Sequence, residues 1–300
     1  MKSRLSLKNL IKRALLLNSS ILALLLLGCS LSTDPTYIKE EISKAIQDLC
    51  NNEYKLEIHS KLVGQTLWVY LPVEELLQKS DKPEKYTEKF SIEINKAAFI
   101  DKNFKIEYLI KKIADQQKSQ EYKFNKAVLE KSNNVWKTIR RVLFSMERGK
   151  EAYAPKFLCL VTADIKSGLV MKDLVYIIDL KKVSYEFISW TEYQHRSIQE
   201  VGFSPIAIGD QEGKNIDYKD VLFADFLALQ MQQRIKLKYQ KPEVGRDTNI
   251  DQEILKVVVH TIKTYQFKDF NEVELANSFA GKENKMILNK EAVWARSIEK

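Results

Sequence analysis

The sequence predicts an α+β fold in which antiparallel hairpins and meanders pack against amphipathic helices. Strand-like segments occur in closely spaced pairs, and helix-like segments stand between the pairs. Single strands that alternate with single helices would instead indicate a parallel α/β sheet, and the chain does not have that order. Hydrophobic residues make up 45% of the chain, which is enough apolar material for a substantial core.

The first pair of strands follows a helix. After Asp34-Pro35, apolar residues recur at intervals of three and four, which predicts an amphipathic helix of about 15 residues. Residues 55–62 then alternate between polar and apolar, the period of a half-buried strand. Val63-Gly64 separates this strand from residues 67–71, so the two segments predict a hairpin.

The second of these strands has two chemically different sides. Trp68 and Tyr70 lie on one side and aliphatic residues lie on the other. If one face were open, the aromatic side could hold a lipid or a peptide. We favour the alternative, in which both faces are covered and the aromatic residues belong to the core.

A meander and a long helix come next. Residues 90–94 and 104–108 alternate as strands, and the turn-prone triplet Asp101-Lys102-Asn103 joins them. Residues 79–89, which precede this pair, are polar. A stripe of apolar residues then predicts a helix from about Tyr122 to Met146.

The second half of the chain repeats the same kinds of element. Residues 157–165 and 174–180 are apolar on both faces, and we expect them to be central strands around Ser167-Gly168. Residues 184–217 are ambiguous, and their clustered glycines with Pro205 make them the best candidate for a loop. Helices are expected at about 218–238 and 250–267. Strands near Val273 and at 286–293 close the chain.

Residues 36–77 and 253–294 share the order of helix followed by hairpin. The two segments align without a gap, and Gly64 falls on Gly281 at the expected turn of each hairpin. A duplicated helix-hairpin unit would explain this alignment, and so would shared secondary structure without duplication.

The N-terminus has the order of an export signal. Residues 1–13 carry five basic residues and no acidic one, residues 14–27 are nearly all apolar, and Gly28 precedes Cys29. An uncleaved anchor is the alternative, but polar residues at 18–20 and 29–33 leave too short an apolar core for a span of about 20 residues. Plain secretion is a further alternative.

The tetrapeptide Leu26-Leu27-Gly28-Cys29 resembles the lipobox of bacterial lipoproteins. The resemblance implies cleavage before Cys29, acylation of that cysteine, and membrane lipid as a partner. Because Ser30 rather than Asp follows the cysteine, it also implies the outer membrane, facing the periplasm. We therefore divide the chain into a signal peptide at 1–28, a lipidated cysteine with a short tether at 29–35, an N-terminal region of helix, meander and long helix at 36–148, and a C-terminal α+β region at 149–300.

Charge argues against a nucleic-acid partner. The full chain has 48 basic and 40 acidic residues, but removal of the signal leaves 43 basic residues against the same 40 acidic ones. Binding to nucleic acid depends on clustered basic residues that neutralise phosphates. A mature chain with so small a net charge does not support that class.

Two cysteines remain beside Cys29. An oxidising periplasm would permit Cys50 and Cys159 to form a disulfide. Two separate buried thiols that behave as small hydrophobic groups are the alternative, and we favour it because sequence alone cannot bring two positions within bonding distance.

No segment of the sequence has a catalytic or cofactor signature. His59, His195 and His260 are isolated from other residues at metal-ligand spacing, and we expect no cofactor. Residues 189–196 combine Ser189, Glu192 and His195, but proximity in sequence does not build a catalytic relay. Neither a serine-hydrolase elbow nor a phosphate-binding loop is present.

The most site-like loop runs from Asp210 to Asp220. Its oxygen-bearing side chains around Gly213 could suit calcium, although the spacing departs from that of an EF-hand. We favour a turn in which Asp217 caps a helix that begins at Tyr218, and no metal.

These features lead to one functional hypothesis and one alternative. We expect a membrane-anchored envelope lipoprotein without enzymatic activity that binds a partner protein or an apolar ligand. The alternative is an envelope hydrolase whose residues converge only in the folded chain, for example around His195 and Asp210.

Overall fold

Two mixed β-sheets and the helices packed on them make up the part of the chain that the structure describes, which confirms the α+β class. The structure is a computed structural model, and it describes residues 37, 41–146, 154–240, 244–279 and 284–296. These residues belong to one unit that begins at Tyr37. The predicted signal peptide at 1–28, the predicted tether at 29–35 and Gly281 lie outside the described residues.

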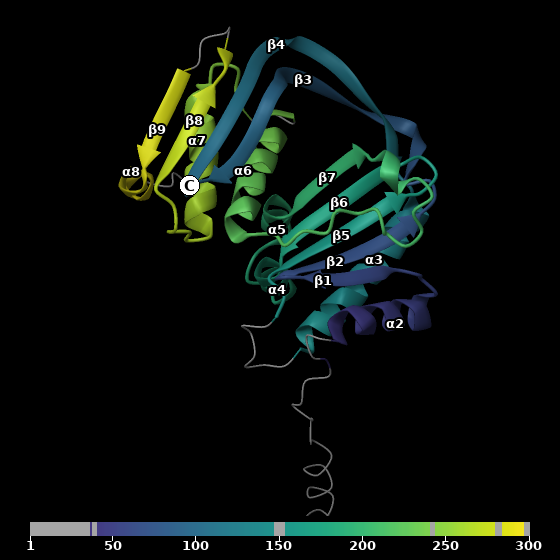
Figure 1. Ribbon diagram of the computed structural model, residues 1–300. Coiled ribbons are helices and arrows are strands. Elements are labelled where there is room, and N and C mark those ends of the chain that lie inside the picture. The colour runs from purple at the N-terminus through teal and green to yellow at the C-terminus, as the bar shows by residue number, and fades with distance from the viewer. Residues whose placement is uncertain (1–36, 38–40, 147–153, 241–243, 280–283, 297–300) are drawn as a thin grey trace, which may run out of the picture. The chain divides into compact units, whose positions relative to one another are not determined.

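The first sheet has the strand order β1-β2-β5-β6-β7 (Figure 1). Its strands are β1 (His59–Val63), β2 (Thr66–Val73), β5 (Phe157–Asp164), β6 (Leu169–Tyr176) and β7 (Ile198–Phe203). Strands β2 and β5 pair in parallel, and the other neighbours are antiparallel. The predicted hairpin around Gly64 is confirmed, and every residue of β5 is buried, as expected for a central strand. The strand predicted at 174–180 begins earlier, at Leu169, and ends at Tyr176.

Helices and aromatic residues cover both faces of this sheet. Helices α2 (Ile42–Tyr54) and α3 (Lys126–Phe144) lie on one face, where they bury the aliphatic side of β2 (Figure 1). The aromatic side of β2, with Trp68 and Tyr70, belongs to a second cluster together with helix α6 (Phe223–Gln240). Both residues are therefore core, as favoured from the sequence.

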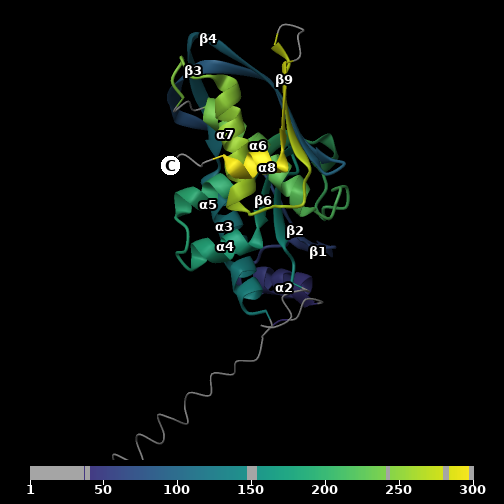
Figure 2. The same ribbon diagram turned by 90° about the vertical axis from the view of Figure 1, so that its left-hand side faces the viewer.

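Two short helices follow β6. Helix α4 (Ile177–Ser184) continues directly from β6, and α5 (Trp190–Arg196) precedes β7. The two helices lie one above the other, and the segment that joins them runs along the outside of the chain (Figure 2). The predicted loop region at 184–217 thus contains a helix and an edge strand.

The second sheet has the order β3-β4-β8-β9. Its strands are β3 (Leu77–Ile100), β4 (Asn103–Phe124), β8 (Glu272–Asn277) and β9 (Asn284–Asn289). Helix α7 (Ile250–Thr264) precedes β8 as predicted, with Asn249 accepting amide hydrogen bonds at its start, and α8 (Lys290–Ala295) follows β9. Both sheets combine strands from before and after residue 148, because β2 pairs with β5 and β4 pairs with β8.

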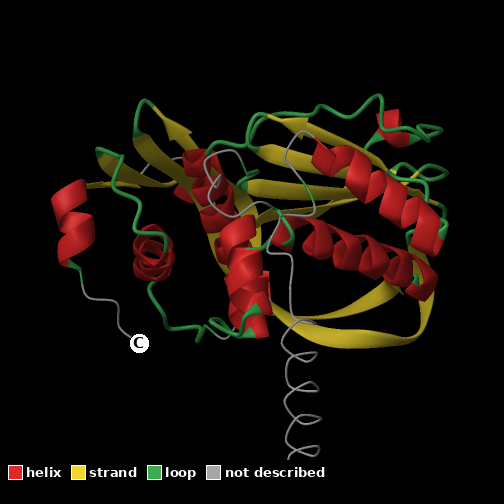
Figure 3. Cartoon of the chain, turned by 90° about the horizontal axis from the view of Figure 1, so that it is seen from below, coloured by secondary structure: helices red, strands yellow, loops and turns green. Residues whose placement is uncertain are grey.

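Helix α6 contacts both sheets. Phe226 packs on Phe157 of β5 with ring centroids 5.1 Å apart, and Tyr239 packs on Phe90 of β3 at the same separation. Seen from below, the helices of the chain lie against the strands of both sheets (Figure 3). One helix is therefore common to the cores of both sheets.

Strands β3 and β4 form a hairpin ribbon that is longer than the sequence predicts. The polar segment 79–89 belongs to β3, and residues 122–124, expected to be helical, end β4. The alternation of polar and apolar residues did not predict this part of the ribbon, because its distal part is exposed on both sides and so has no apolar face. Register shifts at three places accompany the bend of the ribbon (Figure 1). Asp101 and Lys102, both at positive φ, make its two-residue turn.

The two helix-hairpin segments use different strands to join their sheets. After α2, the second strand of the hairpin, β2, pairs in parallel with β5. After α7, the first strand, β8, pairs in parallel with β4. The order of elements recurs in the chain, whereas the way each hairpin enters its sheet does not.

The β1–β2 turn depends on glycine for two reasons. Gly64 has φ +58°, and a Cβ built on it would lie 2.1 Å from Oδ2 of Asp220. The same carboxylate accepts hydrogen bonds from the amide of Gln65 (2.8 Å) and the hydroxyl of Thr66 (3.0 Å). A side chain at Gly64 would therefore strain the backbone and displace Asp220 together.

We expect Gly64→Val to lower the free energy of unfolding by at least about 1 kcal/mol, or a few degrees in Tm. Thermal unfolding measures the change, and Gly202→Ala is the control because a Cβ there meets nothing within 4 Å. In a double-mutant cycle, Asp220→Ala should relieve part of the cost of Gly64→Val. Equal melting of Gly64→Val and wild type would contradict the assignment.

Candidate functional site

A hollow lies where the parallel strands β2 and β5 end. It has a volume of about 870 Å³. Five parts of the chain line it: the end of β2, the start of β3, the end of β4, helix α3 and the β5–β6 turn. The lining residues are Glu74, Glu75, Leu77, Tyr122, Lys131, Asp164, Lys166, Ser167 and Leu169. We call it the strand-end hollow.

Asp164, the last residue of β5, organises the hollow. Its side chain is buried and accepts hydrogen bonds from the amides of Leu76 (3.0 Å), Lys166 (3.0 Å) and Ser167 (3.1 Å). Burial alone would raise the pKa of Asp164, but the hydrogen bonds from Ser167, Leu76 and Lys166 outweigh it and lower the pKa. The carboxylate thereby fixes the loop after β2 against the loop after β5.

The rim of the hollow is charged, and its remaining lining is aromatic and aliphatic. Lys166 and Glu74 form an ion pair at 2.7 Å across the two loops, and both side chains are well exposed. Glu75 adopts φ +60°, which a residue other than glycine adopts at a cost. Tyr122 and Leu169 line the hollow between these charges. A ligand that contacted all of these groups would need both polar and apolar parts.

The polar groups of the lining are engaged with one another. Ser167 interacts with Asp164, and its hydroxyl oxygen accepts a hydrogen bond from the amide of Leu169 (3.3 Å). No histidine lies among the residues that line the hollow. Within the described ranges, no group of three or more His, Cys, Asp or Glu residues is placed to hold a metal ion.

The loop singled out in the sequence lines a second, smaller hollow of about 510 Å³, together with residues 59–61 of β1. Asp210 holds this loop in place, since its carboxylate accepts hydrogen bonds from the amides of Lys214 (3.0 Å) and Asn215 (2.9 Å). Its carbonyl accepts one from the hydroxyl of Tyr70 (2.6 Å). These bonds make the loop a turn, in agreement with the interpretation favoured from the sequence.

The predicted helix cap at Asp217 is wrong. Helix α6 begins at Phe223, and Asp217 is an exposed residue paired with Lys219 at 2.6 Å. Residues 218–222 stay outside the helix because they are held by β2. Tyr218 packs on Trp68 at 5.6 Å, and the amide of Val221 donates to the hydroxyl of Thr66 at 2.7 Å. Tertiary contacts therefore override the local helical pattern.

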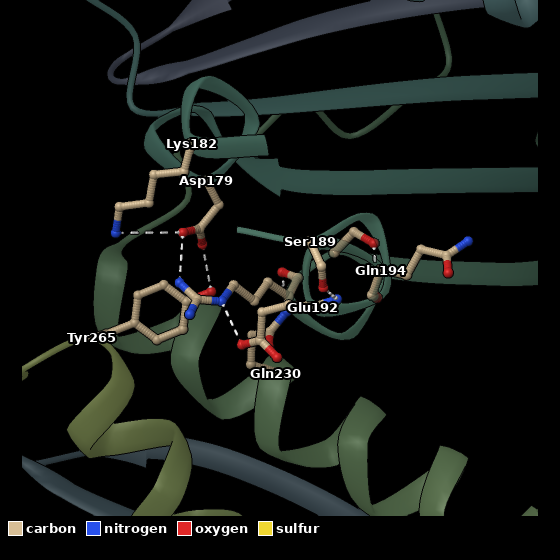
Figure 4. Close-up of polar contacts among 9 residues, drawn as sticks. Asp179, Lys182, Ser189, Glu192, Gln194, Gln230 and Tyr265 are labelled. Atoms are coloured by element: carbon tan, nitrogen blue, oxygen red, sulfur yellow. Dashed lines mark hydrogen bonds and ion pairs between the residues drawn. The ribbon is translucent and has the colours of Figure 1, made fainter. Parts of the chain in front are cut away.

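The segment 189–196 forms helix α5, and its polar residues are used structurally (Figure 4). The Ser189 hydroxyl accepts a hydrogen bond from the amide of Glu192 (3.1 Å), which is a helix cap. Glu192 pairs with Arg196 at 2.8 Å, and Arg196 pairs with the buried Asp179 of α4 at 3.0 Å. His195 is exposed. Ser189, Glu192 and His195 therefore do not form a relay.

This polar cluster connects the short helices with the core between the sheets. Tyr265, directly after α7, donates a hydrogen bond to Asp179 at 2.7 Å, and the side chain of Gln230 on α6 donates to the carbonyl of Arg196 (Figure 4). Asp210, the acid considered together with His195, is buried and engaged in its own loop. No hydrogen bond between described residues joins His195 to Asp210.

Cys50 and Cys159 are free, buried thiols. Cys50 belongs to the cluster under α2 and α3, whereas Cys159 belongs to the cluster on the other face of the first sheet. Burial raises the pKa of both thiols. The disulfide considered from the sequence is not formed, and Cys29 lies outside the described residues.

Sequence reasoning missed the residues that line the strand-end hollow. One signal was available: Asp164 ends an apolar strand and precedes Ser167-Gly168, and an aspartate before a tight turn commonly binds backbone amides. Nothing in the sequence indicates that Glu74, Tyr122 and Lys166 lie around one hollow, because their proximity depends on the pairing of strands that are distant in sequence.

Comparison with known proteins adds no family to these observations. A scan against protein-family models finds no match, and neither the curated proteins nor the solved structures contain a match. Among the helices that the structure describes, none is both long and apolar enough to cross a membrane.

We expect Asp164→Asn to destabilise the chain by about 1–3 kcal/mol at neutral pH, because the amide group cannot accept as the carboxylate does. The pKa of Asp164 is lowered from its ordinary value of 3.8, so its contribution is present above about pH 4 and is lost as the pH falls through the lowered pKa. The difference in unfolding free energy between the variant and the wild type should therefore be constant from pH 7 to about pH 4 and shrink as the pH falls further. Asp217→Asn, at an exposed position, is the control and should change little.

Proposed function

We propose that this protein is a lipid-anchored lipoprotein of the bacterial envelope that binds a partner without catalysing a reaction. The observation that carries the proposal is the order of basic residues 1–13, apolar residues 14–27, and Gly28-Cys29. Acylated Cys29 would place the chain on a membrane, and the resemblance to lipoproteins favours the outer membrane facing the periplasm. More than one acyl chain is needed for stable anchoring, and the modification implied by the resemblance supplies it.

The strand-end hollow supports the binding half of the proposal. Its buried carboxylate, Asp164, is already satisfied by amides, and its exposed Lys166 and Glu74 neutralise each other. What is left for a ligand is an apolar surface at Leu77, Tyr122 and Leu169 with charges around it. An extended segment of an envelope protein or an amphipathic ligand fits that chemistry.

The anchoring half is tested by mass spectrometry of the protein isolated from the membranes of cells that produce it. We expect a chain that begins at Cys29 and carries acyl chains on that residue. Cys29→Ser is the matched control, and it should remain unprocessed because the acylated thiol is gone. An unmodified Cys29 or a retained Met1 in the wild-type chain would overturn the proposal.

The binding half is tested by a photo-crosslinking amino acid placed at Tyr122. The matched position is Phe279, because both side chains are 56% exposed and only Tyr122 lines the hollow. We expect an adduct of defined mass in cells from position 122 and not from position 279. Leu169→Trp, which fills the hollow, should abolish that adduct. Absence of an adduct at position 122, or the same adduct from both positions, would argue against binding there.

A further inference from the structure

Three aromatic side chains are exposed together around the segment that joins α4 to α5. Tyr185, Phe187 and Trp190 are 57%, 79% and 60% exposed, respectively. Large aromatic side chains are normally at least partly covered in folded proteins. Phe187 is the most exposed large hydrophobic residue among those described. We call these three residues the aromatic patch.

The patch is held in place by the fold. The amides of Tyr185 and Phe187 donate to the carbonyls of Lys181 (3.0 Å) and Lys182 (2.8 Å), which continues the end of α4. Tyr185 stacks on Phe144 at 5.7 Å, and Trp190 packs on the buried Tyr193 at 5.3 Å. The rings of Tyr185 and Trp190 therefore each pack on another ring on one side and remain exposed on the other, so the fold fixes their exposed position.

The patch lies next to the point where the described chain begins. Tyr37 forms a β-bridge with Met146, which is two residues after Phe144, the ring that supports Tyr185. Seven residues lie between Cys29 and Tyr37, and the eight Cα–Cα steps from one to the other reach at most about 28 Å in a fully extended chain. A lipid on Cys29 would therefore hold this end of the body near the bilayer surface.

The charges around the patch have the sign that suits anionic phospholipids. Lys181 and Lys182 end α4, and Arg140 of α3 lies close enough to Tyr193 to influence its hydroxyl electrostatically. The acidic groups nearby are Glu186 within the joining segment, Asp179, which is buried and pairs with both Arg196 (3.0 Å) and Lys182 (3.9 Å), and Glu192, which also pairs with Arg196. Basic residues near a membrane surface are attracted to its negative potential.

We propose that the aromatic patch inserts into the headgroup region of the membrane that carries the anchor, and so sets the orientation of the body on that membrane. The inference rests on the proposed lipid anchor. Tyrosine and tryptophan favour such an interface because each has an apolar ring and a polar atom that can stay hydrated. A second contact beside the acyl chains also strengthens attachment, since membrane association generally takes two signals. The strand-end hollow is then presented in one orientation to a partner.

The test uses the protein purified with its lipid and reconstituted into vesicles of phosphatidylethanolamine and phosphatidylglycerol. Tryptophan fluorescence is compared between these vesicles and matched vesicles with brominated acyl chains, which quench only tryptophans that enter the bilayer. We expect quenching in the wild type and its loss in Trp190→Phe, since Trp68 is buried in the core and Trp136 and Trp294 are partly buried against the two clusters. Phe187→Ser should also reduce the quenching, whereas Phe203→Ser, with a side chain 65% exposed on β7, should not.

The outcomes separate this inference from the proposed function. If the protein floats with the vesicles but Trp190→Phe leaves the quenching unchanged, the anchor stands and the inserted patch is wrong. If the protein does not float, both are wrong. A second copy on the patch would keep Trp190 out of the bilayer, so the wild type would float without quenching, and that result would also overturn membrane insertion. Thermal unfolding of each variant establishes that it is folded, which is expected because these side chains are exposed.

Discussion

Burial of β2 and β5 on both faces is the constraint on which the rest of the structure depends. A strand pair in the middle of a sheet leaves two apolar surfaces, and each must be covered. Helices α2 and α3 cover the aliphatic surface, while α6 and the second sheet complete the cluster on the aromatic surface. That aromatic side is covered by the second sheet, by the shared helix α6 and by Tyr218, which packs on Trp68.

Three carboxylates then fix how these layers meet. Asp164 joins the loops after β2 and β5, and Asp179 joins α4, α5 and the end of α7. Both are buried, and each accepts from several donors, as a carboxylate removed from water must. Asp220 is exposed, and it joins the β1–β2 turn to the segment before α6. Removing one partner of a buried carboxylate is costly, so Asp164 and Asp179 define the relative position of elements that apolar packing alone would leave free to slide.

The same arrangement separates the two features relevant to function. The strand-end hollow forms where two parallel strands end and their loops diverge, whereas the aromatic patch forms beside the point where the described chain begins. In the hollow, the side chain of Ser167 interacts with the carboxylate of Asp164, and in the cluster around Arg196 the Ser189 hydroxyl caps α5.

Local patterns in the sequence determined the fold class, the β1–β2 and β8–β9 hairpins, the buried strand β5 and helix α7, because the periodicity of neighbouring residues records each of them. Only the tertiary structure decided the length of the β3–β4 ribbon, the extended path of residues 218–222, the two parallel pairings, and the meeting of Glu74, Tyr122 and Lys166. Those features depend on hydrogen bonds and packing between residues far apart in the chain, and no local period records such contacts.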